Sequence, residues 1–210
     1  MDFQTYNCFK IQFMRVLNSE IQRVNFLAKL IAFSLVVGFV SVFAYGYSAS
    51  APLYAQLKLN LSPSGYGYWN MINMVGMCAS GFLSAYLIKK YDEKYVLVRA
   101  LFLLIPGILS LILLSTFHVN NAYLFFISTC YLYLTSGLLF PTASYFASTA
   151  IADKASASSV MSFVNMGSAM IGVIVMGYLP FQAIGSFTVV LCVFFVIICG
   201  LMFWQIGKTT

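Results

Sequence analysis

Long apolar runs separated by short polar segments divide the sequence into six parts. An α-helix needs about 20 mostly apolar residues to cross a bilayer, because it rises about 1.5 Å per residue through about 30 Å of hydrocarbon. By this measure the pattern predicts six membrane-spanning helices, at residues 26–48, 66–88, 95–117, 122–144, 158–178 and 184–204. Apolar and polar residues do not alternate within the runs, and this argues against a β-barrel, the other fold that satisfies its backbone in lipid.

Composition supports a membrane protein over a soluble one. Hydrophobic residues make up 61% of the chain and charged residues only 8%, whereas soluble domains are about 25% charged. We therefore expect an all-α integral membrane protein in three parts: a basic leader over residues 1–25, a six-helix domain over 26–204 and a short tail over 205–210. The leader is expected to form either an interfacial helix or a partly ordered segment.

Basic residues collect in segments that would share one side of the membrane. The only exception among the 11 lysines and arginines is Lys58. The others are Lys10, Arg15, Arg23 and Lys29 before or within the first span, Lys89, Lys90, Lys94 and Arg99 around the link from span two to span three, Lys154 between spans four and five, and Lys208 at the end. Because basic residues favour the cytoplasmic side, both termini are predicted to be cytoplasmic. The segment with Lys89, Lys90, Asp92 and Lys94 is predicted to be a tight cytoplasmic hairpin.

Acidic residues and histidine are absent from the middle of the predicted spans. All five carboxylates fall in the leader or in predicted cytoplasmic loops, and the single histidine, His118, falls in a short outer loop. Because intramembrane ionisable groups usually carry protons through transporters, any proton coupling would need a carboxylate from outside this chain. The sequence also lacks a Gly-x-Ser-Gly turn and paired cysteines, which intramembrane proteolysis and thiol redox chemistry would require. It predicts no catalytic residue, metal site or cofactor.

The six predicted spans differ in polarity. Spans three and six are Leu, Ile, Val and Phe on nearly all sides, so we expect them to be lipid-facing scaffold. Spans one, two, four and five contain tyrosines, asparagines, serines and glycines, which favour contact with a protein interior or a wet cavity. The order polar, polar, apolar therefore occurs twice, and it predicts two inverted three-helix repeats around a cavity.

Six side chains in the polar spans are candidate substrate-binding residues. They are Tyr45, Tyr47, Asn70, Asn73, Tyr131 and Asn165. Asn73 and Asn165 lie near the middle of their spans, where an unpaired amide would cost a few kcal/mol, so each either lines a substrate path or hydrogen-bonds another helix. Tyr45 and Tyr47 lie on different faces of one helix, as do Tyr131 and Tyr133, so at most one of each pair should face a cavity.

Three sequence motifs suggest a family. The stretch "FAYGYSASAPLYAQLKLNLSPSGYGYWNMINMVGMCASGFLSAYLIKKYDEKY" is followed by "LLFPTASYFAS" and by "ASASSVMSFVNMGSAMIG". In this order they resemble the second half, helices 7 to 12, of major facilitator superfamily drug:proton antiporters of the Bcr/CflA type. The chain departs from the family pattern at Ala51, where a Ser-Pro step is expected, at Asp92, where glycine is usual, and at Lys89 and Lys90, where arginines are commoner.

The resemblance implies a bacterial inner-membrane protein that exports small drug-like compounds in exchange for protons. Members of the family have two similar halves, with the substrate cavity between them and the principal proton-coupling acids in the first half. The resemblance therefore implies that this chain associates with a first half or with itself, or is a nonfunctional fragment of a split gene. The alternative is a non-transporting scaffold or channel-like subunit. Membrane orientation explains the basic residues without nucleic-acid binding, and anionic lipid headgroups are their expected partners.

Overall fold

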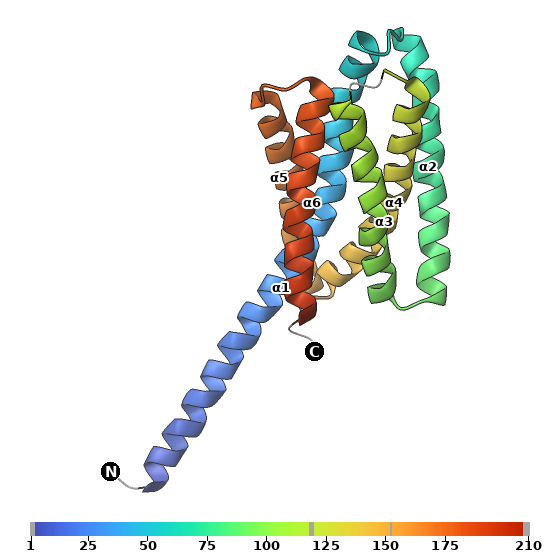
Figure 1. The fold of residues 1–210 in the computed structure, drawn as a ribbon. Helices are drawn as coiled ribbons and strands as arrows, with labels where there is room; N and C mark the ends of the chain where they lie inside the picture. Colours follow the sequence, from blue (N-terminus) through green and yellow to red (C-terminus); the bar gives the residue numbers. More distant parts are fainter. Residues whose placement is uncertain (1–2, 118–119, 152, 208–210) are drawn as a thin grey trace.

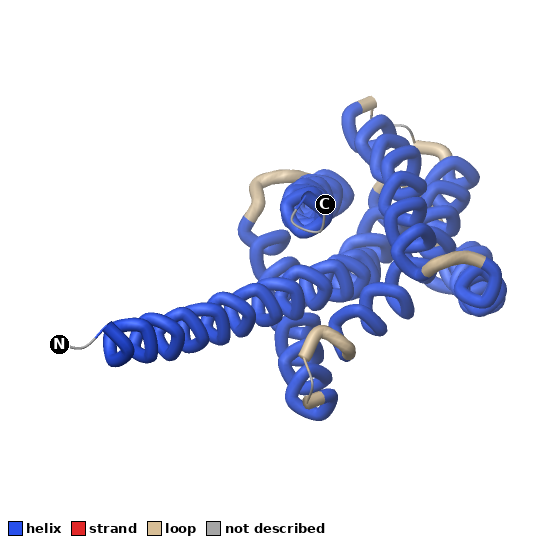
Figure 2. Tube along the Cα trace, turned by 90° about the horizontal axis from the view of Figure 1, so that it is seen from below, coloured by secondary structure: helices blue, strands red, loops and turns tan. Residues whose placement is uncertain are grey.

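The protein is a bundle of six long α-helices (Figure 1). The computed structural model describes residues 3–117, 120–151 and 153–207. The helices are α1 (Phe3–Leu57), α2 (Pro63–Lys90), α3 (Glu93–Thr116), α4 (Ala122–Ser148), α5 (Lys154–Tyr178) and α6 (Ala183–Gly207). Each has a stretch long and apolar enough to cross a membrane, and no strand occurs among the described residues (Figure 2). The predicted all-α membrane fold with six spans is confirmed.

The first helix is longer than its predicted span at both ends. Its backbone is helical from Phe3, and the part before the bundle projects well beyond the other helices (Figures 1 and 2). The predicted division at residue 25 therefore falls inside α1. The side chains of residues 1–23, and residues His118 and Lys208, lie outside the described part. At its other end α1 continues past residue 48 to Leu57, because Tyr54 and Ala55 are buried in the core.

Local side chains define where several helices begin. Ser62 caps α2 by accepting a hydrogen bond from the backbone N–H of Gly65 at 3.1 Å, and Pro63 occupies the first turn, where its missing N–H costs no hydrogen bond. Asn121 caps α4 in the same way, accepting from the N–H of Tyr123 at 2.9 Å. These caps satisfy donors that the first helical turn leaves without partners.

The helices form two sets of three, α1 to α3 and α4 to α6, which interlock. The central helices α1 and α4 contact each other, α2 packs chiefly on α4, and α5 packs chiefly on α1. In the same way α3 packs on α4 and α6 packs on α1. The second and third helices of each set thus pack on the first helix of the other set. This exchange is the arrangement expected from two inverted three-helix repeats.

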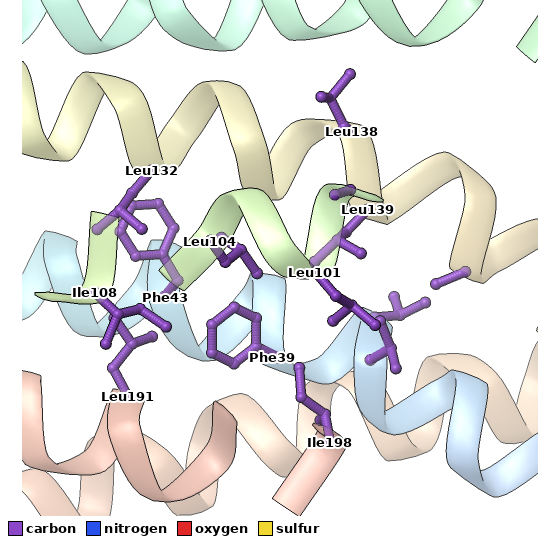
Figure 3. Packing of buried hydrophobic residues seen from close by; sticks show 14 of the residues in the cluster. Phe39, Phe43, Leu101, Leu104, Ile108, Leu132, Leu138, Leu139, Leu191 and Ile198 are labelled. Carbon is purple, nitrogen blue, oxygen red and sulfur yellow. The ribbon is translucent and has the colours of Figure 1, made fainter. Parts of the chain in front are cut away.

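The apolar core lies between α1, α3, α4 and α6 (Figure 3). Phe39 and Phe43 from α1 meet Leu104 from α3, Leu139 from α4 and Leu191 from α6. Each of these five side chains is at most 1% exposed. Because lipid is as apolar as these side chains, close packing stabilises the contacts more than the hydrophobic effect does.

The helices α2 and α5 pack differently from the rest and are the most exposed. Only 22% of the most apolar stretch of each is buried, against 44% in α3 and 39% in α6. Within this bundle α3 and α6 therefore bury more of their surface than α2 and α5, and the expectation that spans three and six are lipid-facing scaffold stays a prediction. Each of these two helices buries one apolar face in the core, whereas α2 and α5 contact the bundle mainly through small and polar residues.

Small residues allow α2 and α5 to approach their neighbours closely. A Cβ atom placed on Gly76 of α2 would lie 2.7 Å from the carbonyl oxygen of Cys130 in α4. Likewise, a Cβ on Gly38 of α1 would lie 2.9 Å from the Cβ of Ser168 in α5. Backbones this close require a small residue on one side, as in other helix pairs within membranes.

Candidate functional site

A cluster of hydrogen-bonded side chains joins α1, α2 and α4. We call Tyr47, Asn70, Asn73 and Thr129 the polar cluster. The Tyr47 hydroxyl donates to Asn70 Oδ1 at 2.9 Å, and Asn73 Nδ2 donates to Tyr47 Oη at 2.6 Å and to Asn70 Oδ1 at 2.9 Å. Thr129 Oγ1 donates to Asn73 Oδ1 at 3.0 Å. Three helices are thus connected through the amide of Asn73.

Helix geometry and aromatic packing explain this cluster. Asn70 and Asn73 are three residues apart and so lie on one face of α2. The ring of Tyr47 stacks on Phe125 with 6.2 Å between centroids and is nearly perpendicular to the ring of Tyr133 with 5.4 Å between centroids. Tyr47 is 2% exposed and Asn73 is 3% exposed, so their hydrogen bonds form away from water, where an unmade bond is costly. The interhelical alternative for Asn73 thus has direct geometric support.

The second candidate asparagine is placed differently. Asn165 is buried on the face of α5 that packs on α1, and its Oδ1 has no hydrogen-bond partner among the described residues. The sequences "INM" at Asn73 and "VNM" at Asn165 show that the two positions correspond in the two repeats. The small residues that follow keep the same spacing, with Gly76 and Ser80 matched by Ser168 and Gly172. The repeat of the order polar, polar, apolar every three spans was found in the sequence, but this residue-by-residue match between α2 and α5 was missed.

Tyr45 lies apart from the polar cluster, on the exposed side of α1. Half of its surface is exposed, and it lines a groove of about 320 Å³ with Met166, Ala169, Met170 and Val173 of α5. Tyr47 points into the bundle instead, which confirms that this pair lies on different faces. Methionine side chains are flexible and polarisable, so such a groove can adapt to ligands of different shape.

Tyr131 belongs to a contact between α3 and α4. Its hydroxyl donates to the carbonyl oxygen of Leu103 at 2.9 Å, in the turn of α3 where Pro106 removes a helical N–H. The neighbouring Gly107 leaves room for α4, because a Cβ there would lie 2.5 Å from Leu132. The structure therefore does not bring Tyr131 together with the other candidate residues.

The predicted hairpin between α2 and α3 is tight, since only two residues separate the helices. The ammonium of Lys90 lies 5.7 Å from the ring centroid of Tyr86 and 5.5 Å from that of Tyr91. The ring of Tyr91 lies 5.5 Å from that of Tyr95, and the Arg99 guanidinium lies 4.0 Å from the same Tyr95 ring. Lys89, Asp92 and Lys94 are exposed. Cations over aromatic rings are attracted by the ring quadrupole. The tyrosines spaced among the basic residues of this hairpin were the sequence signal for these contacts, and it was overlooked.

Comparison with models of known protein families shows which family the chain belongs to. Residues 31–209 match the family model described as Major Facilitator Superfamily. The chain belongs to the major facilitator superfamily. A comparison with curated proteins gives no significant match. Members of this superfamily are transporters, so the predicted membrane-transport class is confirmed at that level, and the six-helix bundle is an MFS-like half.

Proposed function

We propose that this six-helix bundle is one half of an MFS exporter that exchanges small drug-like compounds, often amphipathic or cationic, for protons. In this proposal it corresponds to helices 7 to 12 of a Bcr/CflA-type antiporter in the bacterial inner membrane, with its hairpins of basic residues on the cytoplasmic side. The observation that carries the proposal is the pair of exposed faces on α2 and α5, on either side of the central pair α1 and α4.

These two faces are suited to a second six-helix half. Phe82 of α2 and Phe163 of α5 are each 80% exposed. The faces also carry five exposed methionines: Met71, Met74, Met77, Met166 and Met170. In soluble proteins, several large apolar side chains exposed together on one face mark an interaction surface. Within a bilayer, where lipid also covers apolar faces, the supporting feature is the methionine content, because methionine adapts to varied surfaces. The proposed occupant is a first half supplied by the same or another polypeptide, or a second copy of this chain.

Substrate contacts are proposed on the side of α1, α2 and α5 that this second half would enclose. The groove at Tyr45 offers an aromatic ring and two methionines for an apolar or cationic body. Asn165 Oδ1 is a buried acceptor without a partner among the described residues, and a substrate N–H could supply the missing donor when α5 moves away from α1 during transport. The partly buried Asn70 connects the same region to the polar cluster, so binding there would be coupled to the positions of α1, α2 and α4.

Proton exchange is proposed to depend on the other half. The described carboxylates, Asp92, Glu93 and Asp153, lie at the ends of helices and not deep within the bundle. A titrating carboxylate inside the membrane is the usual proton carrier. The proposal therefore places that group on the facing half, with this bundle contributing substrate contacts.

The first experiment identifies what covers the two faces. Single cysteines replace Phe82 or Phe163 in a variant lacking the five native cysteines, and bifunctional thiol reagents are added to membranes. We expect cross-linking to a six-helix polypeptide or to a second copy. A cysteine at Leu113, which is 54% exposed on α3, serves as the control and should give no defined product. Equal cross-linking at all three positions, or none at any, would contradict the proposed interface.

The second experiment measures transport. Inverted membrane vesicles containing the chain and its cross-linked partner receive a pH gradient, and uptake of a fluorescent cationic dye is followed. We expect gradient-dependent uptake that falls about tenfold or more in Asn73→Leu, because losing a network that fixes helix positions can cost this much through misplacement of contacts. The control Leu113→Val, on an outward face, should retain uptake. Uptake independent of the gradient would indicate a channel, and no uptake would favour a scaffold.

A further inference from the structure

A wholly apolar groove lies on the outer surface of the bundle between α3 and α6. It has a volume of about 90 Å³. Its walls are formed by Val98, Leu101, Phe102 and Ile105 from α3 and by Phe195, Cys199, Met202 and Phe203 from α6. The groove lies toward the end of the bundle where α3 begins and α6 ends. Its inner residues Leu101 and Met202 also belong to the core that these helices share with α1 and α4. Its shape and chemistry suit one segment of a lipid acyl chain.

Two cations stand at the end of this groove nearest the α2–α3 hairpin. Lys94 is exposed and lies one helical turn before Val98, on the same face of α3. Arg99 is exposed and its side chain runs back toward the start of the helix, with the guanidinium 4.0 Å from the ring centroid of Tyr95. Long basic side chains near helix ends reach the membrane surface in this way. The cations therefore lie near the headgroup level while the groove lies among the acyl chains.

The guanidinium of Arg99 has no carboxylate within ion-pair distance among the described side chains. The nearest acidic residues in sequence, Asp92 and Glu93, lie at the start of α3. Lys89, Lys90, Lys94 and Arg99 outnumber these two carboxylates, so the local charge is positive. A planar guanidinium binds a phosphate with two parallel hydrogen bonds, which matches a phospholipid headgroup at this depth.

The internal repeat supplies a comparison within the same molecule. A second groove, of about 470 Å³, lies between α3 and α6 toward the opposite end. Its residues Val189, Cys192 and Val193 repeat the spacing of Val98, Leu101 and Phe102. In the register set by Asn73 and Asn165, Lys94 corresponds to Ser186 and Arg99 corresponds to Leu191. The fold therefore builds a groove at each end, and only the groove beside the hairpin carries these two cations.

We infer that the α3–α6 groove beside the hairpin binds one anionic phospholipid, with an acyl chain along Val98, Phe102 and Phe203 and the phosphate at Arg99 and Lys94. The anionic headgroup is the specific element, because a neutral lipid would fill the groove equally well but would leave the local positive charge unmatched. Bound there, the lipid would hold α3 against α6 at the hairpin end.

Quenching of tryptophan fluorescence tests this site. The chain has two tryptophans, and Trp69→Phe leaves Trp204, which follows Phe203 at the end of the groove, as the only fluorophore. The full chain is reconstituted in vesicles of phosphatidylcholine and phosphatidylglycerol in equal amounts, with bromine on the acyl chains of one lipid at a time. We expect brominated phosphatidylglycerol to quench Trp204 several-fold more effectively than brominated phosphatidylcholine.

Matched variants separate a built site from general surface charge. Lys94→Gln with Arg99→Gln should bring the two lipids to equal quenching, whereas Lys89→Gln with Lys154→Gln removes the same charge elsewhere and should preserve the difference. Cys199→Phe fills the groove and should reduce the difference while leaving all charges in place. Circular dichroism checks that each variant is folded. Equal quenching in the parent protein, an equal loss in both charge pairs, or an unchanged difference in Cys199→Phe would each overturn the inference.

Discussion

Replacing Gly76 by alanine tests the close contact between α2 and α4. The added Cβ would lie 2.7 Å from the carbonyl oxygen of Cys130, whereas ordinary contacts begin at 3.4 Å. The helices must therefore separate by about 0.7 Å at this point, because a backbone carbonyl cannot rotate away as a side chain can. Overpacking of this kind costs about 1–3 kcal/mol, and the separation would also strain the hydrogen bond from Thr129 to Asn73, one turn away.

Gly81→Ala is the matched control, because Gly81 lies on the same helix and a Cβ there meets no atom within 4 Å. Both substitutions gain the higher helix propensity of alanine, about 1 kcal/mol, so the difference between the two variants isolates the steric cost. We expect Gly76→Ala to unfold about 1–3 kcal/mol more easily than Gly81→Ala, measured by reversible unfolding in mixed micelles of increasing sodium dodecyl sulfate. Equal stability of the two variants would show that α2 and α4 are not this close.

Three further changes test other contacts. Asn73→Leu should destabilise the bundle by about 1–3 kcal/mol, because it leaves the buried hydroxyl of Thr129 with one fewer partner; the same unfolding titration measures it. Tyr131→Phe should cost about 1 kcal/mol through loss of one hydrogen bond to Leu103, and no change would show that this bond is not formed in the membrane. The Ser156 hydroxyl, with backbone N–H groups of Ser156 and Ala155, lowers the pKa of Asp153, so its capping of α5 stabilises the fold above the ordinary carboxyl pKa and is lost as pH falls through the lowered value. Asp153→Asn should therefore show a weaker loss of thermal stability in acid than the parent, and an identical acid profile would refute the role of the cap.

The number and type of the helices could be predicted from the sequence, because the length and polarity of each run are set by the bilayer. The exposed face of each helix could not be predicted from the sequence. An apolar face covered by another helix and one covered by lipid have the same composition, so composition did not show that α3 and α6 each bury one face in the core. The better signal was the position of small residues, since Gly76 and Ser168 mark the faces along which α2 and α5 pack.

The candidate site could be predicted only in part. Tyr47, Asn70 and Asn73 were identified because tyrosine and asparagine are costly to leave unpaired in lipid. Thr129 was missed, because a threonine in a helix commonly bonds its own backbone, and it does bond the carbonyl of Phe126 as well as Asn73. Nothing in the sequence around Thr129 indicates a partner on another helix.

Tyr131 shows the opposite difficulty, since a polar residue in a membrane helix can serve the backbone of a neighbour instead of a ligand. The polarity of their spans placed Tyr131 and Tyr47 in the same candidate set, although they lie in separate contacts. Only the three-dimensional arrangement distinguishes a tyrosine that bonds a carbonyl beside a proline from one that bonds two asparagines.

The interlocked packing of the two repeats also constrains how the chain is made. The second helix leaves the ribosome well before the fourth, which covers its polar face in the finished bundle. Until then the amides of α2 can bond only to helices already in the bilayer, and Tyr47 of α1 is positioned to provide such a bond. A newly inserted hairpin of α1 and α2 would thus keep its asparagines hydrogen-bonded to Tyr47 while synthesis continues. The bond from Thr129 to Asn73 would complete the network once α4 is inserted.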